Sequence, residues 1–291
     1  MNKVCGLNNI GNTCYMNSAI QLLLSCKVLV QVLSNYKFKS KILNDIKDTI
    51  NQYKTNSVIT PIIFKQIIEN KYDKFKGCMQ QDSHEFIILF LDILEEEFRK
   101  EDDNEIFGLK IKNMISIIFD TNCSSVVFCE KYNEKSKSKI CDRVLSLSIP
   151  NIKDVNLNNC LDNYTKIEKL SGESQWLYEK NNEYVDAYKR IHIKYLSKYL
   201  IIQLKRFTFF TNSLKDNRDV NMKENFEFNN KVYELRSIII HSGSTNGGHY
   251  ISIVKINDKW MSCNDSIVNE LIDIDQFLKK GYIYLYVKNN K

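Results

Sequence analysis

The spacing of apolar residues changes along this chain, from a helical repeat in its first third to a strand pattern from Met114 onward. Over residues 41–53 and 86–98, apolar side chains recur every three or four positions, which predicts helices buried along one face. Another helix is predicted to start at Pro61, because proline is favoured at the first helical position. Helices followed by strands are typical of an α+β protein. The predicted strands are 115–119, 125–128, 143–149, 199–210, 233–240, 249–256, 259–261 and 282–287.

Length and composition indicate a globular protein. The chain has 291 residues, 43% of them hydrophobic, which is enough for one large core or two modest domains. Its net charge of +6 comes from scattered lysines, so nucleic acid is not expected as a partner. No apolar run reaches the roughly eighteen residues of a spanning helix, and no signal peptide is expected, so we expect no membrane association. Nine cysteines without paired spacing fit a reducing compartment, the cytosol or the nucleus.

Cys14 stands at the start of an apolar segment that predicts a buried helix over residues 14–26. Gly11, Asn12 and Thr13 before it are turn and N-cap residue types, which place Cys14 in or beside the first helical turn. The helix N-terminus favours a thiolate, and a lowered thiol pKa is the usual route to a nucleophilic cysteine. A buried cysteine that only fills the helix start is the alternative.

A cysteine nucleophile needs a base, and one of the four histidines is well placed for this role. His249 follows two glycines and precedes an apolar strand, so another part of the backbone can approach it closely. The adjacent Asn264 and Asp265 end an aromatic strand, and either side chain could orient the imidazole, although such a pair is also a common turn signal. The other histidines, which we expect to be structural, are His84, His192 and His241.

Four motifs, in this order along the chain, resemble those of the ubiquitin-specific protease family of papain-like cysteine peptidases. They are GLNNIGNTCYMNS (residues 6–18), QQDSHEF (80–86), YLIIQLKRF (199–207) and GGHY (247–250), the last followed by WMSCND (260–265). The motifs, and with them the resemblance, span nearly the whole length of the chain.

The resemblance implies a papain-like fold described as a hand. A single catalytic domain is expected over 1–291, with a helical thumb at about 1–105, fingers at about 106–195 and a palm at about 196–291. The N-terminal part would be helical and the C-terminal part mainly antiparallel sheet. The nucleophile and the base would face each other across a cleft between thumb and palm.

The resemblance also implies a role for each catalytic residue. Cys14 would attack the carbonyl after the terminal glycine of ubiquitin, and His249 would act as the base and then as the acid. Asn264 would orient the imidazole, and Asp265 could assist or substitute for it. Asn9 would stabilise the oxyanion with its side-chain amide.

Asn12 is a second candidate for the oxyanion amide, although its simpler role is to cap the helix that follows. Asp82 and Glu85 would hold the basic tail of ubiquitin, since their spacing places both carboxylates on one side of a helical turn. The same two residues form a capping-box pattern, which is the structural alternative. Gly248 and Tyr250, beside the base, would contact the substrate.

The expected fingers depart from the family in their cysteines. Many members bind a structural zinc there through two Cys-x-x-Cys pairs, a spacing that is absent from this sequence. We therefore expect no cofactor and no metal, with apolar packing in place of zinc. A zinc site assembled by the fold remains an alternative, with ligands Cys123, Cys129, Cys141 and Cys160.

The predicted function is that of a deubiquitinase, a thiol-dependent hydrolase that cleaves isopeptide or peptide bonds after the Gly-Gly terminus of ubiquitin. Its partners would be ubiquitin, polyubiquitin and ubiquitinated proteins, and the enzyme would be a monomer. Two alternatives stay open: a ubiquitin-binding pseudoenzyme, or a protease for another ubiquitin-like modifier.

Overall fold

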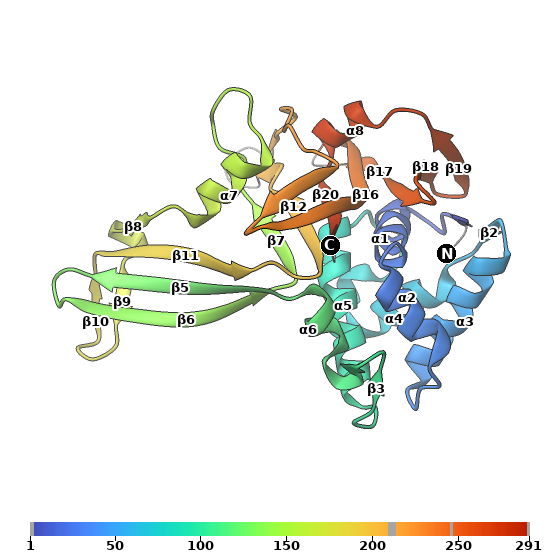
Figure 1. Cartoon of the computed structure of the whole chain (residues 1–291), viewed down its shortest axis with the longest axis horizontal. Coiled ribbons are helices and arrows are strands. Elements are labelled where there is room, and N and C mark those ends of the chain that lie inside the picture. The colour runs from blue at the N-terminus through green and yellow to red at the C-terminus, as the bar shows by residue number, and fades with distance from the viewer. Residues whose placement is uncertain (1–2, 209–213, 245–246, 290–291) are drawn as a thin grey trace.

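The N-terminal part of the computed structural model is a group of helices around one central helix, α1 (Cys14–Leu24) (Figure 1). The structure describes residues 3–208, 214–244 and 247–289. All residues of α1 are buried, because the helix packs between α5 (Ser83–Arg99) on one side and strand β17 (Gly247–Ile256) on the other. The other helices of this body are α2 (Lys27–Asn35), α3 (Lys41–Thr55), α4 (Ile62–Lys71) and α5 (Ser83–Arg99).

Two features of this helical body differ from the sequence prediction. The helix predicted over 14–26 ends at Leu24, and α2 follows as a separate helix bent by 89° from α1. Among the described residues, no single helix is long and apolar enough to cross a membrane. The strand predicted over 115–119 is wrong: Met114–Phe119 forms a helix, α6. Its burial has helical spacing, with Ile115, Ile118 and Phe119 buried and Ile117 exposed.

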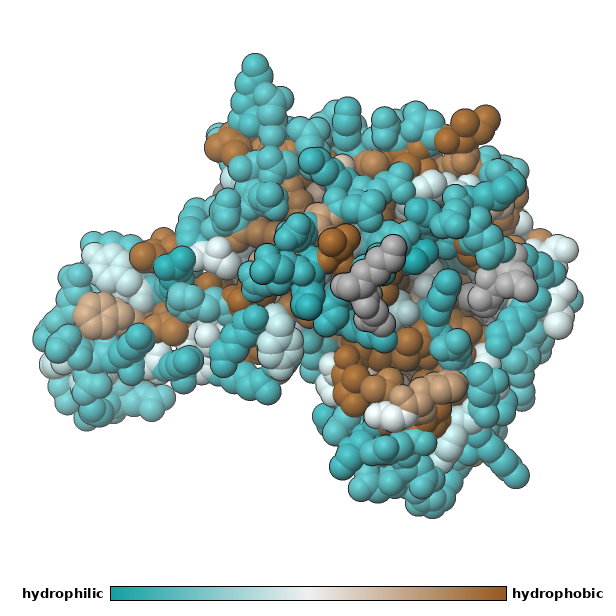
Figure 2. All heavy atoms as spheres, in the orientation of Figure 1, coloured by the Kyte–Doolittle hydropathy of each residue, from teal (hydrophilic) through white to brown (hydrophobic). Residues whose placement is uncertain are grey.

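A four-stranded antiparallel sheet extends from this body (Figure 1). Cys129 and Ala187 of this sheet form a small apolar core with Tyr178 and Val185 of a neighbouring hairpin. On the side visible in Figure 2, the surface of this sheet is mainly hydrophilic, with few apolar side chains. In order, its strands are β6 (Glu134–Asp142), β5 (Thr121–Cys129), β11 (Ala187–Tyr195) and β8 (Glu168–Leu170), with the hairpin of β9 (Trp176–Tyr178) and β10 (Glu183–Val185) near its end.

An eight-stranded sheet carries the C-terminal part of the chain. Its pairs are antiparallel except β12 with β7, so the expected α+β architecture with a mainly antiparallel C-terminal part is confirmed. Its strands in order are β19 (Ile267–Leu271), β18 (Lys259–Asn264), β17 (Gly247–Ile256), β16 (Lys231–Ser244), β20 (Ile283–Lys288), β12 (Tyr199–Leu204) and β7 (Val144–Leu147), with β15 (Asn225–Phe228) also paired to β16.

The remaining elements are short. The strand predicted over 199–210 ends at Leu204, and a second strand, β13, covers Phe207–Thr208, while residues 209 and 210 lie outside the described part of the chain. The others are β1 (Gly6–Leu7), β2 (Val58–Ile59), β3 (Glu105–Ile106), β4 (Leu109–Lys110), α7 (Leu157–Thr165), β14 (Leu214–Lys215) and α8 (Asp275–Lys280).

The helical body and the eight-stranded sheet share one apolar core. Ile239, Ile283 and Leu285 of the sheet pack in the same cluster as Leu22 and Ile20 of α1. The opposite face of the sheet is covered by α7 and α8 through a second cluster. Because α1 contacts β16, β17 and β18, its N-terminus lies at the seam between the two parts.

Candidate active site

His249 and Asn264 lie on neighbouring strands of the eight-stranded sheet and are joined by a hydrogen bond. His249 is the third residue of β17 and Asn264 the last of β18, and His249 Nε2 lies 2.7 Å from Asn264 Oδ1. Because the amide oxygen accepts, the imidazole proton sits on Nε2 in the neutral ring, which leaves a lone pair on Nδ1. Asn264 therefore orients the His249 imidazole, whose free nitrogen is Nδ1.

Cys14 is the first residue of α1 and is 4% exposed. Burial raises the pKa of its thiol above the ordinary value, and the charge of Asp265 adds to this, while the backbone N–H groups of Tyr250 and Tyr15 act in the opposite direction. The helix start therefore lowers the thiol pKa as predicted, through the N–H of Tyr15, but burial outweighs this contribution, and the predicted net lowering is wrong for this resting state. Among the described residues, no hydrogen bond joins Cys14 to His249. Such bonds often form only when substrate binds.

The Asn9 side chain is held by four hydrogen-bonding groups. Its Oδ1 accepts from the backbone N–H groups of Gly11 and Thr13, both at 3.1 Å, and from the Thr13 hydroxyl at 3.4 Å. Its Nδ2 donates to Asp265 Oδ2 at 2.9 Å. Within the described residues, one N–H hydrogen of this amide has no partner, so Asn9 keeps one donor for a ligand.

Asp265 follows Asn264 directly, but its side chain forms hydrogen bonds with different residues. Its Oδ1 accepts from Asn17 Nδ2 at 2.7 Å and its Oδ2 from Asn9, both in the N-terminal part of the chain. No hydrogen bond to His249 is made by this carboxylate in the described structure. Asn17 is 2% exposed and is a residue that sequence reasoning missed, because its partner is 248 positions away.

Asn12 does not cap α1. Thr13 occupies the N-cap position without a side-chain cap bond, and Asn12 Nδ2 instead donates to the carbonyl of Cys78 at 2.7 Å. Gly11 has a φ of 105°, and a Cβ there would lie 2.7 Å from Cys78 Sγ. The cysteine box is thus packed against the loop that precedes α5.

A groove of about 620 Å³ runs between this loop and the eight-stranded sheet. Gln80, another residue that sequence reasoning missed, spans it: Gln80 Oε1 accepts from the backbone N–H of Gly248 at 3.0 Å. The hydrogen bond lies one residue from the base and joins the two sides of the groove. The lining residues are Asn12, Cys78, Met79, Gln80, Gln81, Asp82, Glu85, Phe207, His241, Ser244, Gly247 and Tyr250.

Asp82 acts as an N-cap and also links the two sides of the groove. Its Oδ1 accepts from the backbone N–H groups of His84 and Glu85, at 2.7 and 3.1 Å, at the start of α5. Its Oδ2 accepts from the hydroxyls of Tyr250, on β17, and of Tyr282, the residue just before β20, at 3.0 and 2.9 Å. Burial raises the pKa of both tyrosines, so they remain neutral donors.

The reciprocal half of the predicted capping box is absent from the described contacts, because the Glu85 side chain forms an ion pair with Lys74. Glu85 is about half-exposed at the mouth of the groove. Its carboxylate is therefore accessible to a ligand, whereas that of Asp82 is already bonded within the protein.

His241 and Gly248 are packed against each other beside the base. A Cβ at Gly248 would lie 2.2 Å from His241 Nε2 and 2.4 Å from the carbonyl oxygen of Ser242. His241 is 9% exposed, and burial lowers its pKa to about 4, so the ring is neutral at pH 7. Of the other histidines, His84 Nε2 contacts the Ser146 hydroxyl at 3.3 Å and His192 lies on β11, so both are outside the site.

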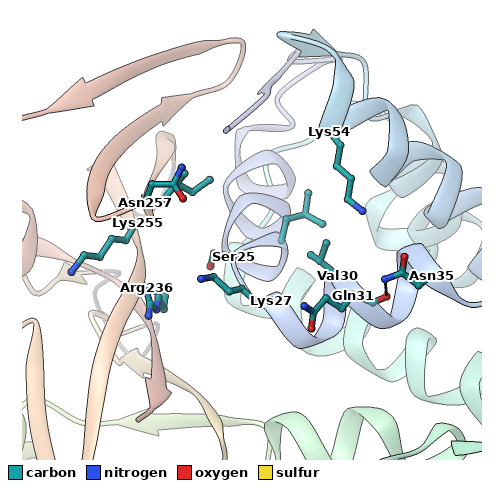
Figure 3. A pocket seen from close by; sticks show the side chains of 11 residues that line it. Ser25, Lys27, Val30, Gln31, Asn35, Lys54, Arg236, Lys255 and Asn257 are labelled. Atoms are coloured by element: carbon teal, nitrogen blue, oxygen red, sulfur yellow. Dashed lines mark hydrogen bonds between the residues drawn. The ribbon is translucent and has the colours of Figure 1, made fainter. Parts of the chain in front are cut away.

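A second cavity, of about 180 Å³, lies between α2 and the turn after β17 (Figure 3). Lys27 and Arg236 stand on its two sides, and Lys255 points away from the helices. Arg236 pairs with Glu234 at 3.2 Å, and Lys54 donates to the Ser34 hydroxyl at 2.6 Å. Its described lining holds no cysteine, histidine or carboxylate, so this cavity lacks the residue types of a cysteine–histidine site.

The four cysteines considered as zinc ligands are spread over three elements. Cys123 and Cys129 are on β5, Cys141 is on β6 and Cys160 is on α7. Across the described ranges, no group of three or more histidines, cysteines or carboxylates is arranged to hold a metal ion. The expectation that no metal is bound stays a prediction.

Comparison with known proteins gives concordant matches over the whole chain. The sequence model of the family described as ubiquitin carboxyl-terminal hydrolase matches residues 5–286. Ubiquitin carboxyl-terminal hydrolase 12 of Salmo salar is 27% identical, over 97% of this chain and 88% of that protein. Ubiquitin carboxyl-terminal hydrolase Usp2 of Drosophila melanogaster is 29% identical, and the match covers 97% of this chain but only 34% of that protein.

Two solved structures are similar along almost the full chain. The SAGA Ubp8/Sgf11/Sus1/Sgf73 module bound to monoubiquitin matches with a TM-score of 0.78 and 25% identity, covering 99% of this chain and 69% of that one. The same module bound to ubiquitin aldehyde matches with a TM-score of 0.78 and 24% identity, covering 99% and 70%. The likeness confirms the expected fold.

Proposed function

The chain belongs to the ubiquitin carboxyl-terminal hydrolase family of cysteine-type deubiquitinases, and from this membership we propose that Cys14 cleaves the bond after the terminal Gly-Gly of ubiquitin. One observation carries the assignment of the site. The imidazole of His249, oriented by Asn264, lies on the strand that packs against the helix headed by Cys14. The relatives whose structures hold monoubiquitin or ubiquitin aldehyde support ubiquitin as the substrate.

The proposed reaction follows from the tautomer of His249, in which Nδ1 is free to accept a proton. His249 Nδ1 takes the proton of Cys14, and the thiolate attacks the carbonyl carbon of the last ubiquitin residue. The C–N bond then breaks, and the imidazolium gives its proton to the leaving amine. Water, deprotonated by the same imidazole, hydrolyses the thioester and restores the thiol. Because burial keeps Cys14 protonated at rest, this proton transfer is needed in every turnover.

Asn9 supplies the oxyanion donor in this proposal. Three of its hydrogen-bonding positions are used within the protein, and its remaining N–H is available to the negative oxygen of the tetrahedral intermediate. Loss of one such donor typically lowers kcat by roughly 100- to 1000-fold.

The groove beside Gln80 would hold the tail of ubiquitin. Glu85, half-exposed at its mouth, is suited to a guanidinium of the tail. Asp82 would contribute its negative charge while Tyr250 fixes its geometry. The hydrogen bond from Gly248 to Gln80 would open, so that the Gly248 N–H binds the tail instead.

We also propose that the enzyme acts as a monomer, without a metal, in the cytosol or the nucleus. All nine cysteines are free thiols in the structure, as a reducing compartment requires.

The test uses ubiquitin that carries a thiol-reactive group at its C-terminus, together with equivalent probes for other ubiquitin-like modifiers. We expect a covalent adduct with the ubiquitin probe that disappears in Cys14→Ala and persists in Cys78→Ala, the matched control for an exposed cysteine in the same groove. An adduct that forms only with the probe for another modifier would identify that modifier, and not ubiquitin, as the substrate. No adduct with any probe would identify a pseudoenzyme.

Replacement of Asn264 tests the third member of the triad. We expect Asn264→Ala to lower turnover and Asn264→Asp to retain more activity, because aspartate keeps an acceptor for His249 Nε2. If Asp265→Ala alone lowers turnover, Asn264 is not the orienting residue.

A further inference from the structure

Asn17 is a buried amide in α1, one helical turn after Cys14, with no role in the chemistry described above. Its Nδ2 donates to Asp265 Oδ1 at 2.7 Å and to the carbonyl oxygens of Leu7 and Asn8 at 3.1 and 3.3 Å. Its Oδ1 is buried and, among the described residues, accepts no hydrogen bond. A buried amide with an unsatisfied oxygen is unfavourable for folding, so its position calls for another explanation.

Asp265 is the partner that connects Asn17 to the site. Each of its two carboxylate oxygens accepts from a different amide, Oδ1 from Asn17 and Oδ2 from Asn9. Its backbone is also fixed, because its carbonyl oxygen accepts from the N–H of Leu7 at 2.9 Å. The carboxylate plane is therefore set from two sides, and the more buried of these contacts is the one to Asn17.

The orientation of the Asn9 amide depends on this carboxylate. Two backbone N–H groups fix its oxygen, but among the residues that the structure describes only Asp265 bonds its nitrogen. We propose that Asn17 is a positioning residue for the oxyanion site, which holds Asp265 so that the uncommitted N–H of Asn9 keeps one direction. The inference rests on the proposed function, since it assigns a task to Asn17 in that same reaction.

The experiment replaces Asn17 with leucine, which has a similar volume and no hydrogen-bonding groups. We expect kcat for a ubiquitin C-terminal amide to fall roughly 10- to 100-fold with little change in KM, less than the effect of removing Asn9 itself. Affinity for ubiquitin aldehyde should fall as well, because its adduct with Cys14 carries the same oxyanion. The rate constant for alkylation of Cys14 by iodoacetamide, a reaction that forms no oxyanion, should stay within about twofold of the wild-type value.

Two measurements separate positioning from a merely structural effect. In the Asn9→Ala background, Asn17→Leu should cause no further loss of kcat, because the group it positions is gone. The pH profile of kcat/KM should keep its shape, since the contacts of His249 are untouched. Additive losses in the double variant, or a shifted profile, would overturn the inference.

Gln21→Leu is the matched control. Gln21 is another buried amide of α1, but it bonds the carbonyl of Cys5 and not Asp265, so its loss should leave kcat unchanged. If Asn17→Leu does not fold, Asp265→Asn is tested instead. This change turns one carboxylate oxygen of residue 265 into an NH₂ donor that faces the Nδ2 donor of Asn17 or Asn9, so kcat should fall to a similar extent. Full activity in the folded variants would overturn the inference, whereas an inactive wild-type protein would overturn the proposed function instead.

Discussion

Asp82→Ala removes two kinds of interaction at once, and their sizes can be worked out from the structure. One oxygen of Asp82 caps α5 through the N–H groups of His84 and Glu85. The other accepts from the hydroxyls of Tyr250, on strand β17 of the eight-stranded sheet, and of Tyr282, the residue just before β20. The variant therefore loses a helix cap and the polar contact that joins the helices to the sheet beside the base.

The cap contributes about 1 kcal/mol to the free energy of unfolding. A hydrogen bond to a charged group contributes about 1.5–3 kcal/mol, and since both tyrosines share one oxygen their contributions do not simply add. We therefore expect Asp82→Ala to lower the free energy of unfolding by roughly 3–5 kcal/mol. Asp82→Asn keeps the cap and can still bond the hydroxyls, so its loss should stay below about 2 kcal/mol.

Urea unfolding of the two variants and the wild type measures these differences. The control is Asn156→Ala, which removes only the cap of α7, where Asn156 accepts from the N–H of Asn159, and should cost about 1 kcal/mol. If Asp82→Ala costs no more than this control, the tyrosine hydroxyls do not stabilise the contact between helices and sheet. Tyr282→Phe, which removes one hydroxyl alone, should fall between the two.

Three further predictions concern other parts of the molecule. Gly248→Ala should lower turnover roughly 100-fold, because the new Cβ would displace the strand that carries His249. Gly247→Ala is the control, since a Cβ there meets nothing nearer than 3.6 Å. Equal losses of turnover in the two variants would contradict the steric argument. Burial lowers the pKa of His241 from 6.5 to about 4, so between these pH values the unfolded state binds more protons than the folded state. The contribution of neutral His241 to the free energy of unfolding is therefore complete above pH 6.5 and is lost as the pH falls toward 4. Stability measured against pH should fall less steeply in His241→Phe, and parallel curves would refute this. Metal analysis of the purified protein should find no stoichiometric zinc; a full equivalent would establish a site among the four cysteines.

Long periodic segments of the sequence were enough to predict most of the fold, but short apolar runs were not. The helix predicted from residue 41 and the strand that carries His249 are both present, because each has an unbroken repeat of one period. Residues 114–119 are only a short apolar run, which fits a buried helix as well as a strand, and packing against α5 decides for the helix.

The prediction of the site was limited by distance along the chain. The motifs around Cys14 and His249 are local, so both residues could be identified from the sequence. Asn17 and Gln80 act through partners 248 and 168 positions away, and no local pattern indicates such pairs. The pKa of Cys14 was mispredicted for a related reason: the helix start is visible in the sequence, but the burial that outweighs it comes from the distant sheet.

The turn between β18 and β19 places Asn264 and Asp265 next to each other while their side chains serve opposite sides of the cleft. Asn264 is the last strand residue and bonds His249, whereas Asp265, the first turn residue, has a φ of 51° and bonds Asn9 and Asn17. Insertion or deletion of a single residue here would exchange the two orientations and disable the base and the oxyanion amide together. The length of this turn is therefore fixed by two hydrogen bonds, that of His249 with Asn264 and that of Asn9 with Asp265.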